Sequence, residues 1–262
     1  MAPEGFTGER PGRGADFAYD EARHLVAYRH ALDLARDKDV LDAGCGEGFG
    51  TQVLADVARS VVGIDYSADA VAACQSAWRK PNLSFRCVDL TAPGYFRARF
   101  DLVLNFQVLE HIAEPAPFLA ALQARIVPGG ALLLTTPNRL TSFSENPYHV
   151  REYAPDELYA LVAPLFASVT LLGVHGNAKV QAFDGARRRA VERILRFDPL
   201  EFRRILPRWL VTQAFARLAV LVRRQVREST AAPRITPEDF AVRADAIESA
   251  LDLVALCRGP TA

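Results

Sequence analysis

Short apolar runs alternate with helical stretches along most of the chain, and this alternation limits the fold more than any other feature. Five apolar runs can be recognised, and four of them end directly in a polar residue. They are Val40–Leu41, Val61–Ile64, Leu83–Val88, Leu102–Leu104 and Ala131–Leu134. Strands this apolar, separated by helices, indicate a parallel sheet that is covered on both faces. The pattern therefore predicts an α/β, doubly wound, Rossmann-like sheet whose carboxyl strand ends line a ligand crevice.

The stretches between the apolar runs have the spacing of helices. Apolar residues recur at intervals of three and four, which places them on one face of a helix. The helices predicted in this way are Tyr19–Arg36, Thr51–Ala58, Ala68–Trp78, Pro117–Ile126 and Pro155–Val162.

The alternation stops near Ala178, and this change divides the chain. Three later stretches look helical: Arg187–Phe197, Leu200–Arg227 and Pro237–Cys257. We therefore expect a disordered N-terminal arm, a main α/β domain and a basic helical C-terminal extension, which cover residues 1–18, 19–183 and 184–262.

Composition argues against several classes of protein. Lys plus Arg and Asp plus Glu both number 31 among 262 residues, so the whole chain has no polyanion-binding signature. Four well-separated cysteines without a CxxC pair argue against a disulfide framework and for a reducing cytoplasm. The N-terminal segment has no apolar run, so we expect no signal peptide. The longest nearly uncharged stretch, 209–222, is too short to cross a bilayer.

The most specific motif is a glycine-rich turn after the first apolar run. Residues 42–51 read D-A-G-C-G-E-G-F-G-T. Glycines in such a turn let backbone N–H groups approach a ligand closely. Phe49 stands where a dinucleotide fingerprint needs its third glycine, and the loop lacks the lysine of a P-loop. The spacing therefore predicts a nucleoside without a pyrophosphate, with Asp65 at the next strand end on its ribose.

Over residues 19–176 these motifs resemble the class I S-adenosylmethionine-dependent methyltransferases. The resemblance implies S-adenosylmethionine as the cofactor and a seven-stranded sheet. Its last, antiparallel strand is expected from segments near Ser168–Val174 and Lys179–Phe183. The resemblance implies a place for each part of the cofactor. The methionine part would lie on Asp42, Gly44, Gly46 and Gly48, and the ribose on Asp65. The adenine would lie beside Tyr66, Asp89 and Leu90, and the sulfonium under the motif of Asn105 and Gln107. In similar enzymes the preceding helix covers the cofactor carboxylate, which points to Tyr28, although simple packing explains Tyr28 equally well.

A polar loop after the fifth apolar run is the expected place of the methyl acceptor. The sulfonium methyl is a strong electrophile, so the protein must chiefly align a nucleophile and exclude water. An alcohol acceptor also needs a base, for which His149 is the first candidate and His111 the second. No His, Asp and Glu set has the spacing of metal ligands, so we expect no required metal. The residues predicted to bind the substrate are Asn138, Tyr148 and Arg151.

The C-terminal extension is strongly basic, with twelve arginines and three acids over 185–227. Three roles stay open: a lid that packs on the core, a helix on an anionic membrane surface, and a polyanion site. We expect no nucleic-acid partner, because aromatic residues are not interleaved with the basic ones. The protein is thus expected in the cytoplasm, with peripheral membrane contact and oligomeric state left open.

Five segments together carry a closer resemblance. They are Y-D-E-A-R-H-L-V-A-Y-R-H-A-L, G-C-G-E-G-F-G-T, N-P-Y-H-V-R-E-Y, the R-F-D-P-L to R-R-I-L-P-R stretch and the final A-L-D-L-V-A-L-C-R. The layout is similar to that of actinobacterial mycofactocin oligosaccharide methyltransferases, which implies O-methylation of a glucose unit on a glycosylated, peptide-derived redox cofactor. One alternative is a methyltransferase for a small lipophilic acceptor such as a quinone precursor. Another is a cofactor-binding protein without transfer activity that is anchored by its basic helices.

Overall fold

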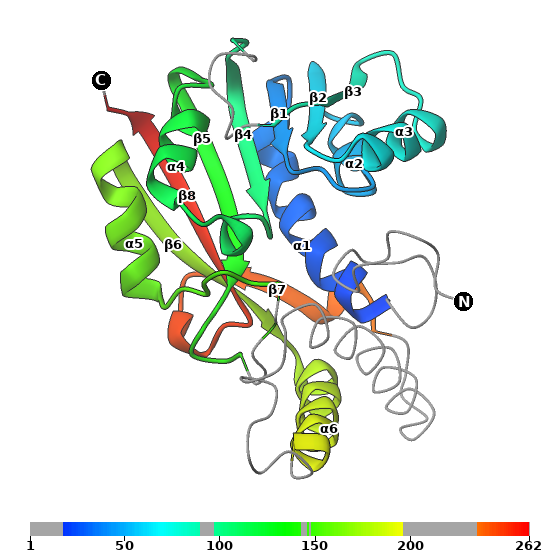
Figure 1. Ribbon diagram of the computed structural model, residues 1–262, viewed down its shortest axis with the longest axis vertical. Helices are drawn as coiled ribbons and strands as arrows, with labels where there is room; N and C mark the ends of the chain where they lie inside the picture. Colours follow the sequence, from blue (N-terminus) through cyan, green and yellow to red (C-terminus); the bar gives the residue numbers. More distant parts are fainter. Residues whose placement is uncertain (1–17, 90–96, 143–145, 147, 196–234, 262) are drawn as a thin grey trace.

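An eight-stranded sheet forms the centre of the computed structural model, which describes residues 18–89, 97–142, 146, 148–195 and 235–261 (Figure 1). The strand order is β3-β2-β1-β4-β5-β8-β6-β7. The strands are β1 (Asp39–Ala43), β2 (Ser60–Asp65), β3 (Leu83–Cys87), β4 (Phe100–Phe106), β5 (Ile126–Pro137), β6 (Phe166–Gly176), β7 (Phe240–Arg243) and β8 (Asp252–Pro260). Apart from Ala18, which begins the first helix, the predicted N-terminal arm lies outside the described residues.

The five neighbouring strands β3, β2, β1, β4 and β5 run parallel, which confirms the predicted core of the sheet. Successive side chains of a strand point to opposite faces, and here both faces are buried. Val40 and Leu102 belong to the apolar cluster on the α1 side, whereas their neighbours Leu41 and Val103 belong to the cluster on the other side. The continuous apolar runs of the sequence therefore reflect a sheet that is covered twice.

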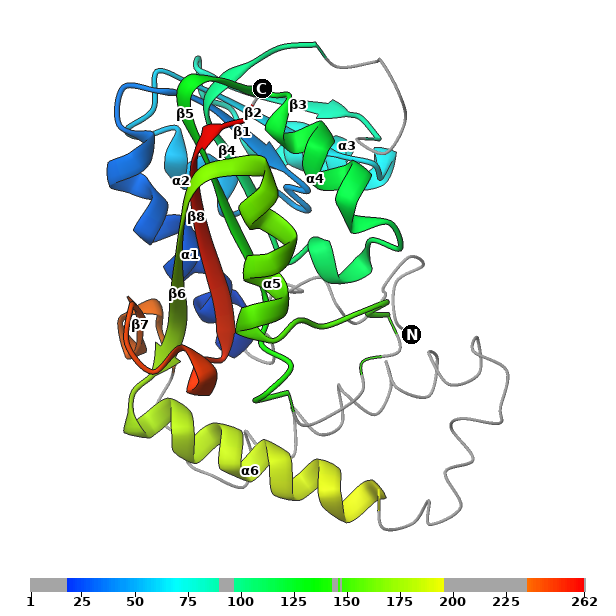
Figure 2. The ribbon, with the colours of Figure 1, turned by 90° about the vertical axis from the view of Figure 1, so that its left-hand side faces the viewer.

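The first five helices lie where the apolar periodicity predicts them, within a few residues, whereas the last, Ala178–Leu195, begins nine residues before the predicted start at Arg187. They are α1 (Ala18–Ala35), α2 (Thr51–Leu54), α3 (Ala68–Ala77), α4 (Pro115–Gln123), α5 (Pro155–Val162) and α6 (Ala178–Leu195), with single 3-10 turns η1 (Leu109–His111), η2 (Ala163–Leu165), η3 (Pro237–Asp239) and η4 (Ile247–Ser249). Helices α4 and α5 cover one face of the sheet and α1 the other (Figures 1 and 2). Helix α6 lies beyond the edge toward which the arrow of β5 points.

The predicted helix over 237–257 is wrong, because this segment contains two strands. Strand β8 lies between β5 and β6 and is antiparallel to both. Its run Leu253–Cys257 is fully buried, and such a short apolar run has no periodicity that separates a strand from a buried helix. Pairing with two distant strands satisfies its backbone groups on both edges and decides the outcome.

Three further expectations need correction. Lys179–Phe183 lies in α6 and is no strand, whereas Ser168–Val174 lies in β6 as expected. The sheet has eight strands because the short β7 adds an edge next to β6. The boundary at residue 184 is also wrong, since α6 crosses it and β8 completes the main sheet.

A buried ion pair joins α1 to the start of β8. The Arg23 guanidinium donates to both carboxylate oxygens of Asp252 and, at 2.8 Å, to the Leu251 carbonyl oxygen. The Asp252 side chain is only 2% exposed, so its charge depends on this partner. The contact fixes the helix that precedes the glycine loop against the last strand of the chain.

We predict that Arg23→Ala lowers the free energy of unfolding by roughly 3 kcal/mol, because it leaves the Asp252 carboxylate buried without its cation. Arg29→Ala on the same helix is the matched control, since its pair with Glu238 is solvent-exposed and its loss should lower the stability much less. Equilibrium unfolding in urea measures both variants. Equal losses in the two would contradict the role given to the buried pair.

Candidate active site

The glycine loop begins at the end of β1 and turns with left-handed backbone. Gly44, Gly46 and Gly48 have φ angles of 90°, 54° and 73°, a region that side chains disfavour. A Cβ atom on Gly44 would lie 2.3 Å from Val108 Cγ2, so packing also requires glycine there. A Cβ atom on Gly46 would meet no atom within 4 Å among the described residues. The backbone at Gly46 is therefore open to a ligand.

Asp65 at the end of β2 is tied to this loop. Its carboxylate oxygens accept hydrogen bonds from the Gly46 N–H at 3.0 Å and the Ser67 N–H at 2.9 Å. The residue is 7% exposed, whereas the following Tyr66 is 76% exposed. Each carboxylate oxygen can accept a further hydrogen bond, which suits the hydroxyls of a ribose.

The residues expected beside the adenine are described only in part. Asp89 is exposed beyond the end of β3, and Leu90 lies outside the described residues. The roles given to Tyr66, Asp89 and Leu90 beside the adenine stay predictions.

Asp42 supports the loop from inside the protein. Its Oδ2 accepts hydrogen bonds from the Thr51 hydroxyl at 2.6 Å and the Tyr28 hydroxyl at 3.1 Å, while Oδ1 has no hydrogen-bond partner among the described residues. Burial raises the pKa of Asp42 to about 6, and the nearby Asp65 charge acts in the same direction against the two hydrogen bonds. Asp42 and Tyr28 are both buried, so their observed part in the site is to hold the loop in place.

The end of β4 closes against the same loop. The buried Asn105 donates a hydrogen bond from Nδ2 to the Ala43 carbonyl oxygen at 2.8 Å, which links β4 to the end of β1. Gln107 adopts a left-handed φ of 55°, and its N–H donates to the Thr135 carbonyl oxygen at 2.9 Å. This sharp turn directs the chain from the motif of Asn105 and Gln107 into η1.

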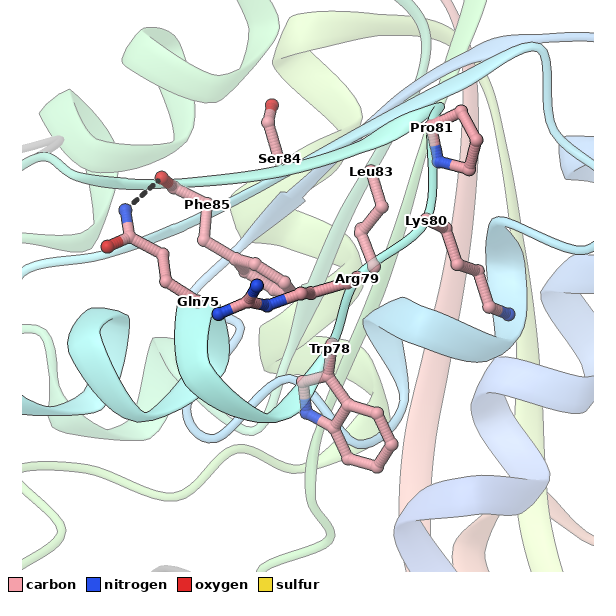
Figure 3. A pocket seen from close by; sticks show the side chains of 8 residues that line it. All are labelled: Gln75, Trp78, Arg79, Lys80, Pro81, Leu83, Ser84 and Phe85. Atoms are coloured by element: carbon pink, nitrogen blue, oxygen red, sulfur yellow. Dashed lines mark hydrogen bonds between the residues drawn. The ribbon is translucent and has the colours of Figure 1, made fainter.

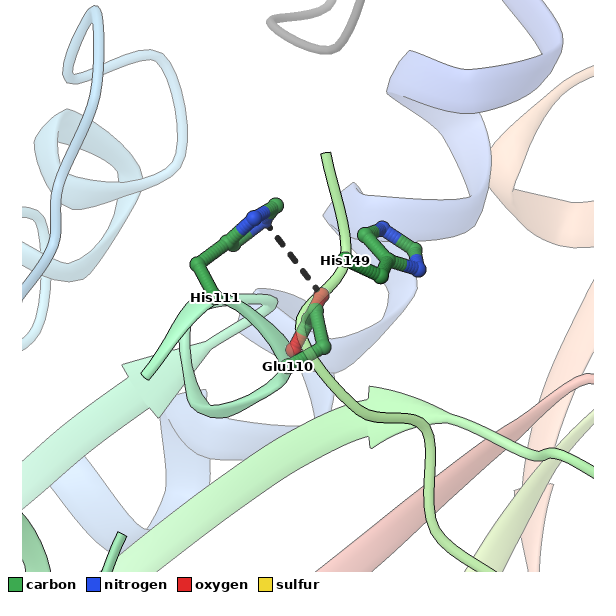
Figure 4. A group of neighbouring side chains, drawn as sticks. All are labelled: Glu110, His111 and His149. Carbon is green, nitrogen blue, oxygen red and sulfur yellow. Dashed lines mark ion pairs between the residues drawn. The ribbon is translucent and has the colours of Figure 1, made fainter. Parts of the chain in front are cut away.

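Three acid–base side chains meet beyond this turn. Glu110 and His111 belong to η1, and His149 comes from the loop after β5 (Figure 4). The two imidazole rings are 5.1 Å apart, edge to face, and His111 Nε2 lies 3.9 Å from Glu110 Oε1. The Glu110 carbonyl oxygen accepts hydrogen bonds from the Val150 and Arg151 N–H groups, at 2.7 and 3.2 Å, and so holds the loop here. The two predicted base candidates are therefore neighbours.

Hydrogen bonds at both nitrogens fix the His149 ring. Nδ1 lies 2.7 Å from Glu152 Oε1, and Nε2 lies 2.9 Å from Asn146 Nδ2. Because Asn146 Oδ1 accepts the Tyr148 N–H, the amide must donate to Nε2 through its nitrogen. A neutral imidazole with its proton on Nδ1 satisfies both contacts, because Nδ1 then donates to Glu152 and Nε2 accepts from Asn146. Burial would raise the pKa of Glu152, but hydrogen bonds with His149 and Ser142 lower it.

Burial perturbs the other two groups in the cluster. It raises the pKa of Glu110 to about 7, although the Thr136 hydroxyl donates to Oε2 at 3.0 Å and opposes the shift. Burial and the adjacent His149 lower the pKa of His111, against the effect of the Tyr148 carbonyl oxygen 3.2 Å from Nδ1. Perturbed titratable groups in contact with one another are typical of functional sites.

Comparison with known proteins decides the family. Residues 16–169 match the model of a methyltransferase domain. The chain is 39% identical over 186 residues, 68% of its length and 71% of the relative, to a probable S-adenosylmethionine-dependent methyltransferase of Mycolicibacterium smegmatis. A protein of the same description from Mycobacterium tuberculosis is 37% identical over 68% of this chain and 67% of its own length. The chain is an S-adenosylmethionine-dependent methyltransferase.

More distant matches bear on the fold and the acceptor. A ubiquinone biosynthesis O-methyltransferase of a Bradyrhizobium species is 35% identical over 38% of this chain and 40% of its own length. The crystal structure of the [4+2]-cyclase SpnF is similar with a TM-score of 0.57, at 19% identity over 93% of this chain and 82% of that one. A putative methyltransferase from Bacillus halodurans has a TM-score of 0.55, at 12% identity over 90% and 99% of the two chains. These two structures confirm the class I methyltransferase fold.

S-adenosylmethionine is the cofactor of this methyltransferase, and the residues at the ends of β1 and β2 fit it. The backbone at Gly46 is open on its outer side, and the Asp65 carboxylate lies within hydrogen-bond distance of the same residue. The loop would hold the methionine part and Asp65 the ribose, as the motifs imply. The individual contacts of Asp42, Asn105 and Gln107 with the cofactor stay predictions.

The predicted substrate residues differ in their placement. Asn138 is fully buried and donates to the carbonyl oxygens of Ile247, Glu248 and Ala250, so its amide joins β5 to the segment before β8. This placement contradicts a substrate-binding role for Asn138. Arg151 is exposed and pairs with Glu157 at 3.3 Å, and Tyr148 contributes its backbone to the His111 and Asn146 contacts. Both lie beside the cluster.

Sequence reasoning missed three members of this site. Glu110, Asn146 and Glu152 are not among the catalytic or substrate-binding residues predicted from the sequence. Glu152 stands three residues after His149, which is the signal that identifies it. Sequence spacing does not reveal that folding brings Glu110, His111 and His149 together, and the expectation that no metal is required stays a prediction.

A separate cavity lies at the outer edge of the sheet (Figure 3). It has a volume of about 530 Å³ between the end of α3 and β3, and Trp78, Arg79 and Phe85 line part of it. None of its lining residues is a predicted site residue. It stands apart from the cluster that contains Glu110.

The first turns of the basic segment pack on the main domain. Tyr19 of α1 donates a hydrogen bond to Asp184 of α6 at 2.8 Å, and the Arg187 guanidinium lies 5.0 Å from the Tyr19 ring centroid. These contacts favour, for the start of the basic segment, the first of the three open roles, a lid that packs on the core. Residues 196–234 lie outside the described part, so contact with an acceptor or membrane surface stays a prediction. Within the described residues, no helix is both long and apolar enough for a membrane span.

We predict that Asp65→Ala weakens S-adenosylhomocysteine binding by about 1.5–3 kcal/mol, because a charged acceptor for the ribose hydroxyls is lost. Calorimetry measures the affinity, with circular dichroism as the test of folding. Asp69→Ala, an exposed acid on α3, is the matched control and should bind normally. Unchanged affinity in a folded Asp65→Ala variant would remove the ribose assignment.

We predict that Asp42→Asn gains stability relative to the wild type as the pH rises from 4 to 7. The folded pKa of Asp42, about 6, lies above its usual 3.8, so the folded state binds more protons between these values. Wild-type stability therefore falls as the pH rises through 6, by roughly 2–3 kcal/mol, whereas asparagine does not titrate. Urea unfolding of both proteins across this range is the measurement. A constant difference between them would show that Asp42 titrates normally.

Proposed function

We propose that this methyltransferase transfers the methyl group to a sugar hydroxyl of a mycofactocin-type oligosaccharide. The observation that carries O-methylation is the hydrogen-bonded pair of His149 and Glu152 beside His111, at the strand-end edge of the sheet. The sugar acceptor is supported by the sequence layout shared with mycofactocin oligosaccharide methyltransferases. It is also compatible with mycobacterial relatives, although their names specify no acceptor.

The cofactor supplies an electrophilic methyl group, which leaves alignment, water exclusion and proton removal to the protein. An uncharged alcohol is a poor nucleophile, and a base that takes its proton accelerates the reaction. A neutral imidazole is suited to this role near pH 7. In its neutral form His149 directs the lone pair of Nε2 at Asn146.

His149 is the proposed base, or the residue that positions the base. Glu152 holds Nδ1–H and orients the ring, as carboxylates orient histidines in other acid–base sites. An acceptor hydroxyl would take the place of the Asn146 amide at Nε2 and donate its proton along the same line. Arg151 and Tyr148 flank the position and are proposed to orient neighbouring sugar hydroxyls.

The alternative acceptor is a small lipophilic molecule such as a quinone precursor. The observation that favours it is the partial match to a ubiquinone biosynthesis O-methyltransferase, which covers 38% of this chain. A phenol also needs a base, so the same cluster would serve. A non-catalytic cofactor-binding protein is less favoured, because the glycine loop, Asp65 and an organised acid–base cluster are all present.

Acceptor identity can be tested directly. The protein is incubated with methyl-labelled S-adenosylmethionine and, separately, a mycofactocin-type oligosaccharide, a plain glucose oligomer and a demethylated quinone precursor. Mass spectrometry then locates the label. Transfer to a hydroxyl of the glycosylated compound supports the proposal. Transfer to the quinone precursor alone replaces it with the alternative, and transfer to none of the acceptors contradicts it.

We predict that His149→Ala lowers kcat by roughly 10²–10⁴ while S-adenosylhomocysteine still binds. Wild-type turnover should fall in acid, where the imidazole is protonated and cannot accept a proton. His30→Ala, a histidine of α1 outside the cluster, is the control and should retain activity. A near-normal His149→Ala variant alongside an inactive but folded His111→Ala variant would transfer the role to His111.

A further inference from the structure

The cluster of Glu110, His111 and His149 has a second property besides acid–base chemistry. One ligand atom from each residue lies within 4.8 Å of the other two (Figure 4). We infer that these three side chains form a binding site for a divalent transition-metal ion beside the cofactor crevice. The site itself does not depend on the acceptor proposed above, whereas its use in methyl transfer does.

Each of the three side chains is held by an outer contact on the atom that would not bind the ion. The Thr136 hydroxyl donates to Glu110 Oε2, the Tyr148 carbonyl oxygen lies at His111 Nδ1, and Glu152 Oε1 lies at His149 Nδ1. Contacts of this kind fix the tautomer and direction of metal-binding histidines. In their neutral forms both imidazoles therefore carry the proton on Nδ1 and direct a lone pair through Nε2.

The distances between the ligand atoms of these side chains are close to those found in a site that holds a metal ion. Atoms bound to one ion at about 2.1 Å lie roughly 3–4 Å apart. The Glu110 Oε1 to His111 Nε2 distance of 3.9 Å is already in this range. The other separations are at most 4.8 Å, so His149 must move closer to bind the same ion through Nε2, and the Asn146 amide must leave that nitrogen. Because His149 lies on a loop rather than in the sheet, this shift leaves the core unchanged.

Charge favours a cation at this place. Glu110 is 1% exposed, and among the described residues it forms no ion pair with an arginine or lysine. An ionised carboxylate is costly to bury unless a positive charge accompanies it. A divalent ion between Glu110 and the two imidazoles would provide that charge.

The donor set selects the class of metal. Two imidazole nitrogens and one carboxylate are typical of Zn²⁺ and Fe²⁺ sites that keep positions open for another ligand. Mg²⁺ and Ca²⁺ prefer oxygen ligands. An ion here would hold and polarise the acceptor hydroxyl oxygen through an open position. In that state His149 acts as a ligand, and the ion takes over the activation of the hydroxyl.

Cobalt is the probe for this site, because Co²⁺ bound by such ligands absorbs visible light. Metal-free protein is titrated with Co²⁺ without cofactor or acceptor, and Zn²⁺ is then added as a competitor. The expected result is one tightly bound equivalent of Co²⁺, displaced by Zn²⁺ and not by equimolar Mg²⁺. Glu110→Gln, His111→Ala and His149→Ala should each weaken binding at least about tenfold, and Glu152→Gln about 10–100-fold.

His30→Ala is the matched control and should bind Co²⁺ like the wild type. Thermal unfolding and S-adenosylhomocysteine binding identify variants that fail to fold, and His111→Ala keeps the test valid because His111 is a partly exposed residue. The inference is overturned if Co²⁺ gives no visible band, or if His111→Ala and His149→Ala bind it as tightly as His30→Ala. Since no acceptor is present, this failure is distinct from failure of the proposed methyl transfer.

Discussion

The site depends on two backbone hydrogen bonds to the carbonyl oxygen of Glu110. They come from Val150 and Arg151 and hold the loop after β5 against the turn that ends β4. Together with the contact between the Tyr148 carbonyl oxygen and His111 Nδ1, they place His149 beside His111. Backbone contacts of this kind carry no sequence signature, because any residue can make them.

The parallel sheet places the remaining parts at the same edge. Strands β1, β2 and β4 end in the glycine loop, in Asp65 and in the motif of Asn105, and hydrogen bonds link these three ends to one another. Asp42 and Tyr28 hold the loop from beneath, while Gly46 leaves its outer side open. Hydrogen bonds therefore join the parts expected to hold the cofactor, whereas the residues expected to meet the acceptor lie on a loop. This division suits a methyltransferase whose acceptor site is formed by a loop on a fixed scaffold.

Local patterns predicted the parts of the molecule that local forces determine. The glycine loop, the polar ends of the strands and the helix Pro155–Val162 all follow from spacing within a few residues. Strand β8 could not be predicted from local spacing, because its short apolar run becomes a strand only by pairing with β5 and β6, far away in the sequence. Asn138 was misassigned for the same reason, since its amide binds carbonyl groups more than a hundred residues later. His111 and His149 were identified separately, but their contact is a property of the fold.

A crystal structure with S-adenosylhomocysteine and the acceptor tests most directly that the cluster around His149 receives the reacting hydroxyl. The acceptor oxygen should lie between the cofactor sulfur and the cluster, within about 3 Å of His149 Nε2 or of an ion bound there. The Asn146 amide should have left that nitrogen. An acceptor bound elsewhere along the crevice, with His149 still paired to Asn146, would contradict this arrangement.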